Sequence, residues 1–186
     1  MLVSLLKEAN NPNNIPIEKL SMTKVALSIG SNINPAVNLR QAINSLRSQF
    51  GKIVTSSVYE SEAVGFDGDN FLNLVVLISV DYELDELARI LKSMEDHQGR
   101  DRNAEKFSGR TLDIDVLTYD SLEGSHAGIT LPRPEITENA FVLLPLSEVL
   151  PESRHPFFDK TYAELWSGYD KSKQNLWKIE FDLAAR

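Results

Sequence analysis

Two aspartates separated by one residue, Asp113 and Asp115, are the strongest chemical signal in the sequence. They lie in a largely apolar segment, 111–119, that is typical of a strand, and residues two apart in a strand point to the same face. Their Cα atoms would then be roughly 6.5–7 Å apart, which suits hard cations shared between carboxylates and phosphate oxygens. An exposed strand face that happens to carry two aspartates is the alternative, although aspartate is disfavoured in strands.

The segment before this strand is basic. Between residues 100 and 110, four basic side chains stand against two acidic ones, in a protein whose formal net charge is −8. Guanidinium groups bind phosphate oxygens and developing negative charge, so a cationic loop leading into two carboxylates predicts a metal–polyphosphate site. A solvated surface loop is the other interpretation. The basic residues are Arg100, Arg102, Lys106 and Arg110.

Glu95 is the third candidate. It lies four residues after Leu91 and therefore continues the buried stripe of a helix predicted over 84–99. An acid near the carboxyl end of a helix is opposed by the helix dipole, and we expect Arg100 or Arg110 to compensate it. A frayed and solvated last turn would also explain its position.

Three further signals are weaker. The run Gly30-Ser31-Asn32 follows a strand and precedes a helix, which would place backbone amides near an anion, although turn chemistry explains it equally well. Asn73 begins a buried strand and must find hydrogen-bond partners there. Phe71 and Phe141 fit either a core position or a position that stacks on a ligand.

Composition excludes several classes of protein. The 186 residues include no cysteine, which rules out disulfides and thiolate metal sites, and the acidity disfavours nucleic acids and anionic membranes as partners. The three histidines show no ligand spacing, and there is no Gly-x4-Gly-Lys-Ser/Thr phosphate loop. No stretch approaches the roughly 20 apolar residues of a spanning helix. We expect a cytoplasmic protein with small-molecule ligands.

The succession of elements predicts an α+β fold. Its order, β-α-β-β-α-β, is the ferredoxin-like split β-α-β arrangement, with a four-stranded antiparallel sheet, helices on one face and ligand loops on the other. Asn34 as N-cap and Pro35 at the first helical position begin the first helix, which ends before Gly51. We expect strands at 25–29, 53–59, 73–80 and 111–119, and helices at 35–50, 84–99 and 136–144.

The ends of the chain differ from this core. Residues 1–22 contain a polar, turn-rich run and are expected to form a loosely held extension, with a packing helix at 2–9 as the alternative. Residues 23–186 are expected to form a single domain. The last forty residues hold apolar positions without clear periodicity.

The densest motif reads Gly99-Arg100-x-Arg102, then Gly109-Arg110-Thr111-Leu112-Asp113-Ile114-Asp115. It resembles the 6-hydroxymethyl-7,8-dihydropterin pyrophosphokinase family, whose fold is ferredoxin-like. The resemblance covers about residues 24–160 and implies transfer of pyrophosphate from ATP to the pterin hydroxymethyl group, with release of AMP, in folate synthesis. Further matches are 28–32, 70–73, Leu131-Pro132, Phe141, Pro145-Leu146 and His155-Pro156.

The resemblance also implies roles for the charged candidates. Asp113 and Asp115 would hold two Mg²⁺ ions that bridge the ATP phosphates. Arg100 and Arg110 would contact the transferring group, with help from Arg102. Glu95 belongs to the nucleotide side, together with the same two arginines. The family is commonly monomeric, and we expect a monomer.

On the pterin side, the resemblance assigns hydrogen bonding to Asn73 and to backbone groups around Ser61 and Val64. Phe71 and Phe141 resemble the aromatic residues that sandwich the pterin ring. Phe107 stands outside this set, where the family often has tryptophan.

Two positions depart from the family pattern. Leu-Pro is commonly followed by histidine and here by Arg133, while the arginine common six residues later is here Asn139. We expect Arg133 to supply, on the nucleotide side, the cation that Asn139 lacks. One alternative is a relative that binds pterin or nucleotide without turnover. Another is a ferredoxin-like interaction domain, which leaves the charged residues unexplained.

Overall fold

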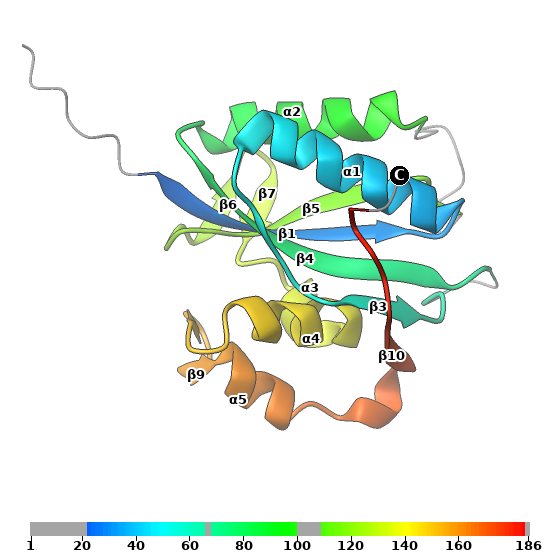
Figure 1. Cartoon of the computed structure of the whole chain (residues 1–186). Helices are drawn as coiled ribbons and strands as arrows, with labels where there is room; N and C mark the ends of the chain where they lie inside the picture. The colour runs from blue at the N-terminus through cyan, green and yellow to red at the C-terminus, as the bar shows by residue number, and fades with distance from the viewer. Residues whose placement is uncertain (1–21, 66–67, 100–108, 185–186) are drawn as a thin grey trace, which may run out of the picture.

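The computed structural model describes residues 22–65, 68–99 and 109–184 (Figure 1). Up to residue 119, its strands and helices follow one another in the predicted order. The first half holds β1 (Thr23–Ser31), α1 (Pro35–Phe50), β2 (Val54–Thr55), β3 (Val58–Ser61), β4 (Phe71–Val80) and α2 (Leu84–His97). The second half holds β5 (Asp113–Tyr119), β6 (Gly124–His126), β7 (Ile129–Leu131), α3 (Glu135–Glu138), α4 (Ala140–Val149), β8 (Arg154–His155), β9 (Lys160–Thr161), α5 (Tyr162–Ser167), the 3-10 helix η1 (Lys171–Lys173) and β10 (Leu176–Ile179).

An antiparallel six-stranded sheet forms the centre of the fold. Its strand order is β10-β3-β4-β1-β5, and β2 also pairs with β4. β1 lies between β4 and β5 and pairs along its whole length with β4, from Thr23 opposite Val80 to Ser31 opposite Leu72. The α+β class and the β-α-β-β-α-β core predicted from the sequence are confirmed.

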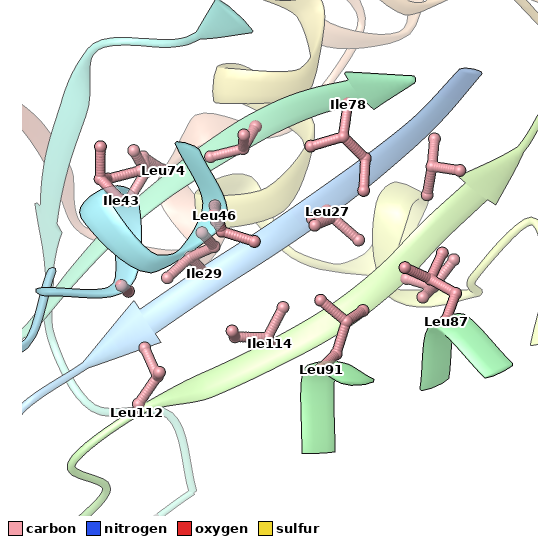
Figure 2. Packing of buried hydrophobic residues seen from close by; sticks show 14 of the residues in the cluster. Leu27, Ile29, Ile43, Leu46, Leu74, Ile78, Leu87, Leu91, Leu112 and Ile114 are labelled. Carbon is pink, nitrogen blue, oxygen red and sulfur yellow. The ribbon is translucent and has the colours of Figure 1, made fainter. Parts of the chain in front are cut away.

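Helices α1 and α2 cover one face of the sheet and bury the larger hydrophobic cluster (Figure 2). The buried residues of α1 recur at three- or four-residue spacing, as in an amphipathic helix. Full burial of one such side chain contributes about 1.5–3 kcal/mol to folding. Figure 2 shows Ile43 and Leu46 of α1 and Leu87 and Leu91 of α2 packed against Leu27, Ile29, Leu74, Ile78, Leu112 and Ile114.

Helices also cover part of the opposite face, where only loops were expected. α3, α4 and α5 lie on this side (Figure 1) and form a second cluster with residues from three strands. The central strands are apolar on both faces, and such a sheet must be covered on both. The expected four strands also become six, because the strand expected at 53–59 is divided into β2 and β3, and β10 is added beside β3. The strand residues in this cluster are Ala26, Val75 and Leu117.

The strand predicted after α1 is divided into β2 and β3 by two serines. Ser56 Oγ accepts a hydrogen bond from Val75 N–H at 3.0 Å, and Ser56 N–H donates to Val75 O at 2.9 Å. Glu148 of α4 accepts from Ser57 N–H at 2.8 Å and from Tyr59 Oη at 2.5 Å. Ser56 thus keeps one backbone hydrogen bond to Val75, while side-chain oxygens of Ser56 and Glu148 accept the bonds of Val75 N–H and Ser57 N–H.

The start of α1 differs from the predicted cap. Asn34 has the left-handed conformation (φ 44°, ψ 48°) and its side chain makes no capping hydrogen bond. Asn38 Nδ2 instead donates to Ile33 O at 2.6 Å. Pro35 occupies the first helical position as predicted.

A helix cap lies near the C-terminus, at the start of α5. Thr161 Oγ1 accepts from Glu164 N–H at 3.1 Å, and Glu164 Oε2 accepts from Thr161 N–H at 2.7 Å. This capping box begins α5, and its Thr-x-x-Glu signature was readable in the sequence.

Residues 1–21 lie outside the described ranges, so the expectation for residues 1–22 stays a prediction. In the ranges described, no helix is long and apolar enough to cross a membrane.

Candidate active site

Asp113 and Asp115 lie on β5 and face away from its buried side. Ile114, between them, packs in the larger cluster. β5 pairs with β1 so that Asp113 stands opposite Gly30 and Asp115 opposite Ser28. The predicted alternation is confirmed, and both carboxylates line the same cavity.

Each of the two carboxylates is paired with an arginine. Arg110 Nη1 donates to Asp113 Oδ2, and Arg133 Nη2 donates to Asp115 Oδ1 at 2.5 Å. Arg133 Nε also lies 3.7 Å from Glu135 Oε2. Burial, then the negative charges of Asp113 and Glu135, raise the pKa of Asp115, while the two arginines oppose the shift. Three carboxylates against two guanidinium groups leave negative charge that a divalent cation would neutralise.

The cavity has a volume of about 330 Å³ and combines these charges with two aromatic rings. Phe71 comes from β4 and Phe141 from α4, so the rings reach the cavity from different layers of the fold. An aromatic, partly polar cavity of this size suits a small heterocyclic ligand. Its lining includes Ser61, Val64, Phe71, Asn73, Arg110, Asp113, Asp115, Arg133, Glu135, Asn139 and Phe141.

Asn73 presents a buried amide at the wall of this cavity. It is 4% exposed, and its Nδ2 donates to Ser61 Oγ at 3.0 Å. Gly30 on the neighbouring strand makes room for it, because a Cβ there would lie 3.2 Å from Asn73 Oδ1 and 3.8 Å from the Phe71 ring. A larger residue at position 30 would therefore displace the amide.

A second cavity of about 240 Å³ lies beside β5, where α2 and β7 meet the strand. Its own lining includes Lys92 and Glu95 of α2 and Ile129 of β7. Three residues line both cavities: Asp113, Asp115 and Arg133. The carboxylates therefore stand at the boundary between two spaces of different chemistry.

Glu95 continues the buried stripe of α2, as predicted, and is 5% exposed. Its Oε1 accepts a hydrogen bond from Ile114 N–H at 2.8 Å, so it holds the backbone of β5 between the two aspartates. Arg110, one of the two cations expected to compensate it, pairs with Asp113. Arg100, the other, lies outside the described residues.

The Gly30-Ser31-Asn32 run ties β1 to the start of β5 and so positions Arg110. Ser31 Oγ donates to Thr111 O at 2.6 Å. Asn32 N–H donates to Arg110 O at 3.0 Å, and Asn32 Oδ1 accepts from Arg110 N–H at 2.6 Å. The backbone N–H and the side-chain Oδ1 of Asn32 are thus both bonded to the backbone of Arg110. This favours the interpretation of the run as a turn over the one that places its backbone amides near an anion.

The donor set fits Mg²⁺ with its substrate. Mg²⁺ is usually held by one or two carboxylates plus substrate phosphates, and Asp113 and Asp115 supply two on one face. Within the described ranges, no three His, Asp or Glu side chains are grouped to hold a metal by themselves. Arg100, Arg102 and Phe107 fall outside those ranges, so their roles stay predictions.

Lys92 and Glu135 are among the cavity residues that were not predicted. Lys92 lies three residues before Glu95 on α2, and helical spacing would have placed both on one side. Glu135 follows Arg133 closely in sequence, but nothing in its local pattern marks it as part of a site.

The fold and the site define a class of protein: ferredoxin-like α+β domains in which carboxylates and arginines meet between two ligand cavities. Such a set suits transfer of phosphoryl groups, which depends on positioning and neutralisation of charge. Residues 26–151 match the model of the 7,8-dihydro-6-hydroxymethylpterin-pyrophosphokinase family. The chain belongs to this family, and it is accordingly an enzyme, an ATP-dependent pyrophosphokinase.

Individual relatives agree with this membership. The chain is 35% identical over 142 residues to the 2-amino-4-hydroxy-6-hydroxymethyldihydropteridine pyrophosphokinase of Synechocystis sp., covering 75% of this chain and 72% of that protein. It is 34% identical over 156 residues to the Bacillus subtilis protein of the same name, covering 82% and 89%. A crystal structure of an HPPK-DHPS protein in complex with substrates aligns with TM-score 0.63 and 16% identity, over 82% of this chain and 44% of that chain, which shows the shared fold.

Proposed function

We propose that this enzyme transfers the terminal pyrophosphate of ATP to the hydroxymethyl group of 6-hydroxymethyl-7,8-dihydropterin and releases AMP, as a step of folate synthesis. The observation that carries the proposal is that two cavities of different chemistry share Asp113, Asp115 and Arg133. Transfer between two bound substrates needs such a boundary, because the reacting atoms must meet in line. The described part of one chain supplies both cavities, so a monomer suffices.

The larger cavity suits the pterin. Phe71 and Phe141 would stack on the flat ring, and aromatic pairs favour offset or edge-on contacts. Asn73 would bind the polar edge of the ring, since its Nδ2 donates to Ser61 Oγ at 3.0 Å and only at 3.4 Å to Phe71 O, a longer bond that a ligand acceptor would replace. Val64 lies at the exposed rim, near the wall that Ser61 provides.

The smaller cavity suits the nucleotide. Lys92 and Glu95 provide charged groups there, and Arg110 and Arg133 lie next to the carboxylates where the phosphates would pass. Arg100 and Arg102 join this side by resemblance to the family.

Asp113 and Asp115 would hold two Mg²⁺, which when bound lower the charge of the triphosphate and the pKa of the attacking hydroxyl. In the reaction, the hydroxymethyl oxygen forms a bond to the β-phosphorus, while the bond from that phosphorus to the oxygen bridging to the α-phosphorus breaks. AMP leaves with the bridging oxygen, and the hydroxyl proton passes to solvent. Arg110 and Arg133 would donate hydrogen bonds to phosphate oxygens as charge develops on them.

The proposal is tested by AMP release from ATP and Mg²⁺, with and without 6-hydroxymethyl-7,8-dihydropterin. We expect AMP that depends on the pterin. AMP formation that fails although pterin binds would favour a family member without turnover, for which Arg133 and Asn139 are the departures to examine. Binding of neither substrate would favour an interaction domain.

A further inference from the structure

The chain near its C-terminus joins the two walls of the cavity that we assign to pterin. Gln174 Nε2 donates to Asn139 Oδ1 at 2.9 Å, and Gln174 Oε1 accepts from Ala140 N–H at 2.7 Å. Two residues later, Leu176 of β10 pairs with Ser61 of β3. Residues two apart in an extended chain are about 6.5–7 Å apart. The short segment 174–176 therefore contacts both the α4 wall and the β3 wall of the cavity.

Gln174 acts as a cap for α4 from a distant part of the sequence. The first amides of a helix need partners from outside the helix, and the N-cap residue Asn139 provides no side-chain cap. The Gln174 carbonyl oxygen binds Ala140 N–H, at the first position of α4. Phe141 is the next residue and lines the cavity. The cap therefore also fixes the backbone position from which the Phe141 ring extends into the cavity.

Gln174 also sets the orientation of the Asn139 amide. The Gln174 oxygen is engaged with Ala140 N–H, so Gln174 meets Asn139 with its NH₂ group, and only Asn139 Oδ1 can accept that bond. Asn139 lines the cavity, and in the ranges described its Nδ2 makes no hydrogen bond to another protein group. The donor side of this amide is therefore available to a ligand.

The segment that carries Gln174 lies beyond residues 26–151, the part of the chain that matches the family model. It is fastened on both sides of Gln174. Tyr169 Oη donates to Glu138 O at 2.8 Å, and Trp177 Nε1 donates to Glu60 Oε2 at 3.2 Å. The contacts of Gln174 thus belong to a firmly held connection between α3–α4 and β3.

We propose that Gln174 is a positioning residue of the pterin site. By holding Ala140 and Asn139, it keeps the first turn of α4, and with it Phe141, at the distance from β3 and β4 that a flat ring requires. The proposal rests on the proposed function for the identity of the ligand. It predicts a loss of pterin affinity without a loss of turnover at saturating pterin.

The test is a fluorescence titration with 6-hydroxymethyl-7,8-dihydropterin in the absence of ATP, with thermal melting as a check of folding. Gln174→Ala removes both hydrogen bonds, and we expect the pterin dissociation constant to rise about five- to tenfold. Gln174→Glu keeps an oxygen for Ala140 N–H but cannot donate to Asn139 Oδ1, so its pterin dissociation constant should lie between those of the wild type and Gln174→Ala. Lys173→Ala, an exposed change in the same turn, is the matched control and should bind as the wild type does.

A second measurement asks whether Gln174 acts through Phe141. In a Phe141→Ala background, the Gln174→Ala change should have little further effect on pterin affinity, because coupled residues are not additive. In AMP formation, Gln174→Ala should raise KM for pterin and leave kcat within about twofold. An equal loss of affinity in both backgrounds, or wild-type affinity in Gln174→Ala, overturns the proposal.

If Gln174→Ala does not fold, Gln174→Met replaces it, since methionine keeps the side-chain length without either hydrogen bond. Equal pterin affinity of Gln174→Met and Gln174→Glu then overturns the proposal. A wild-type protein that binds pterin but forms no AMP overturns the proposed function and leaves the role of Gln174 open to the same binding test. A wild-type protein that binds no pterin overturns both.

Discussion

Replacing Arg133 by alanine tests whether this arginine supplies the positive charge that the family pattern places at position 139. Its side chain is 25% exposed, and its Nη2 lies 2.5 Å from Asp115 Oδ1. Hydrogen bonds to charged groups contribute about 1.5–3 kcal/mol, and partial exposure favours the lower half of that range. A loss of about 1.5–2 kcal/mol in phosphate binding corresponds to a KM for ATP that rises about 10–30-fold.

The same substitution should strengthen the binding of Mg²⁺ while it weakens the binding of ATP. Without Arg133, Asp115 lies beside Asp113 and Glu135 with Arg110 as its remaining cationic neighbour among the groups that perturb it. The site becomes more negative, so the Mg²⁺ concentration for half-maximal activity should fall while KM for ATP rises. Two changes of opposite sign distinguish a lost phosphate contact from general damage to the site.

The assay is AMP formation at saturating pterin and pH 8, with ATP titrated at constant free Mg²⁺ and Mg²⁺ titrated at constant ATP. Arg133→Lys should be intermediate, because lysine keeps the charge but loses the planar fork. Arg154→Ala is the control, since Arg154 is 59% exposed and pairs with Asp159. A KM for ATP within twofold of the wild type in Arg133→Ala would refute the reasoning.

Three further predictions concern the carboxylates, the buried amide and a buried histidine. Asp113→Asn and Asp115→Asn should each lower AMP formation by about 10³-fold or more without lowering the melting temperature, because the strand loses like-charge repulsion; near-wild-type turnover in either variant contradicts the two-metal assignment. Asn73→Ala should raise the pterin dissociation constant about 10–100-fold in a fluorescence titration, as an unsatisfied buried group costs about 1–3 kcal/mol, and unchanged affinity would remove Asn73 from the site. His155 is buried, and burial lowers its pKa in the folded state. In the unfolded chain the His155 imidazole gains a proton near pH 6.5, whereas in the folded state it does so only at lower pH. The free energy of unfolding should therefore fall as the pH drops below about 6.5. Urea unfolding at pH 7.5 and 5.5 measures the loss, which should be smaller in His155→Gln; an equal loss in both proteins would exclude His155 as its source.

Several features of the site were predictable because they depend on short-range periodicity. The side chains of Asp113 and Asp115 share a face because a strand repeats every two residues. Glu95 is buried because it continues the stripe of α2, which repeats every three or four residues. The order of elements followed from the same two periods, and so did the α+β class.

Other features depend on residues far apart in the chain. The break between β2 and β3 involves Glu148, which is 91 positions from Ser57 and accepts its N–H. The helices on the second face could not be assigned from a pattern that shows only that β4 is apolar on both sides. The capping box at Thr161 was readable, but the pairing of β10 with β3 was not.

The sequence by itself determined which residue types the site contains and which face of each element carries them, because side-chain direction is set by local backbone geometry. Only the tertiary structure decided which of those side chains meet. Arg133 pairs with Asp115 across 18 positions, and Gln174 binds Asn139 across 35. Such contacts arise when packed layers bring separate segments together, and that packing depends on the whole buried core.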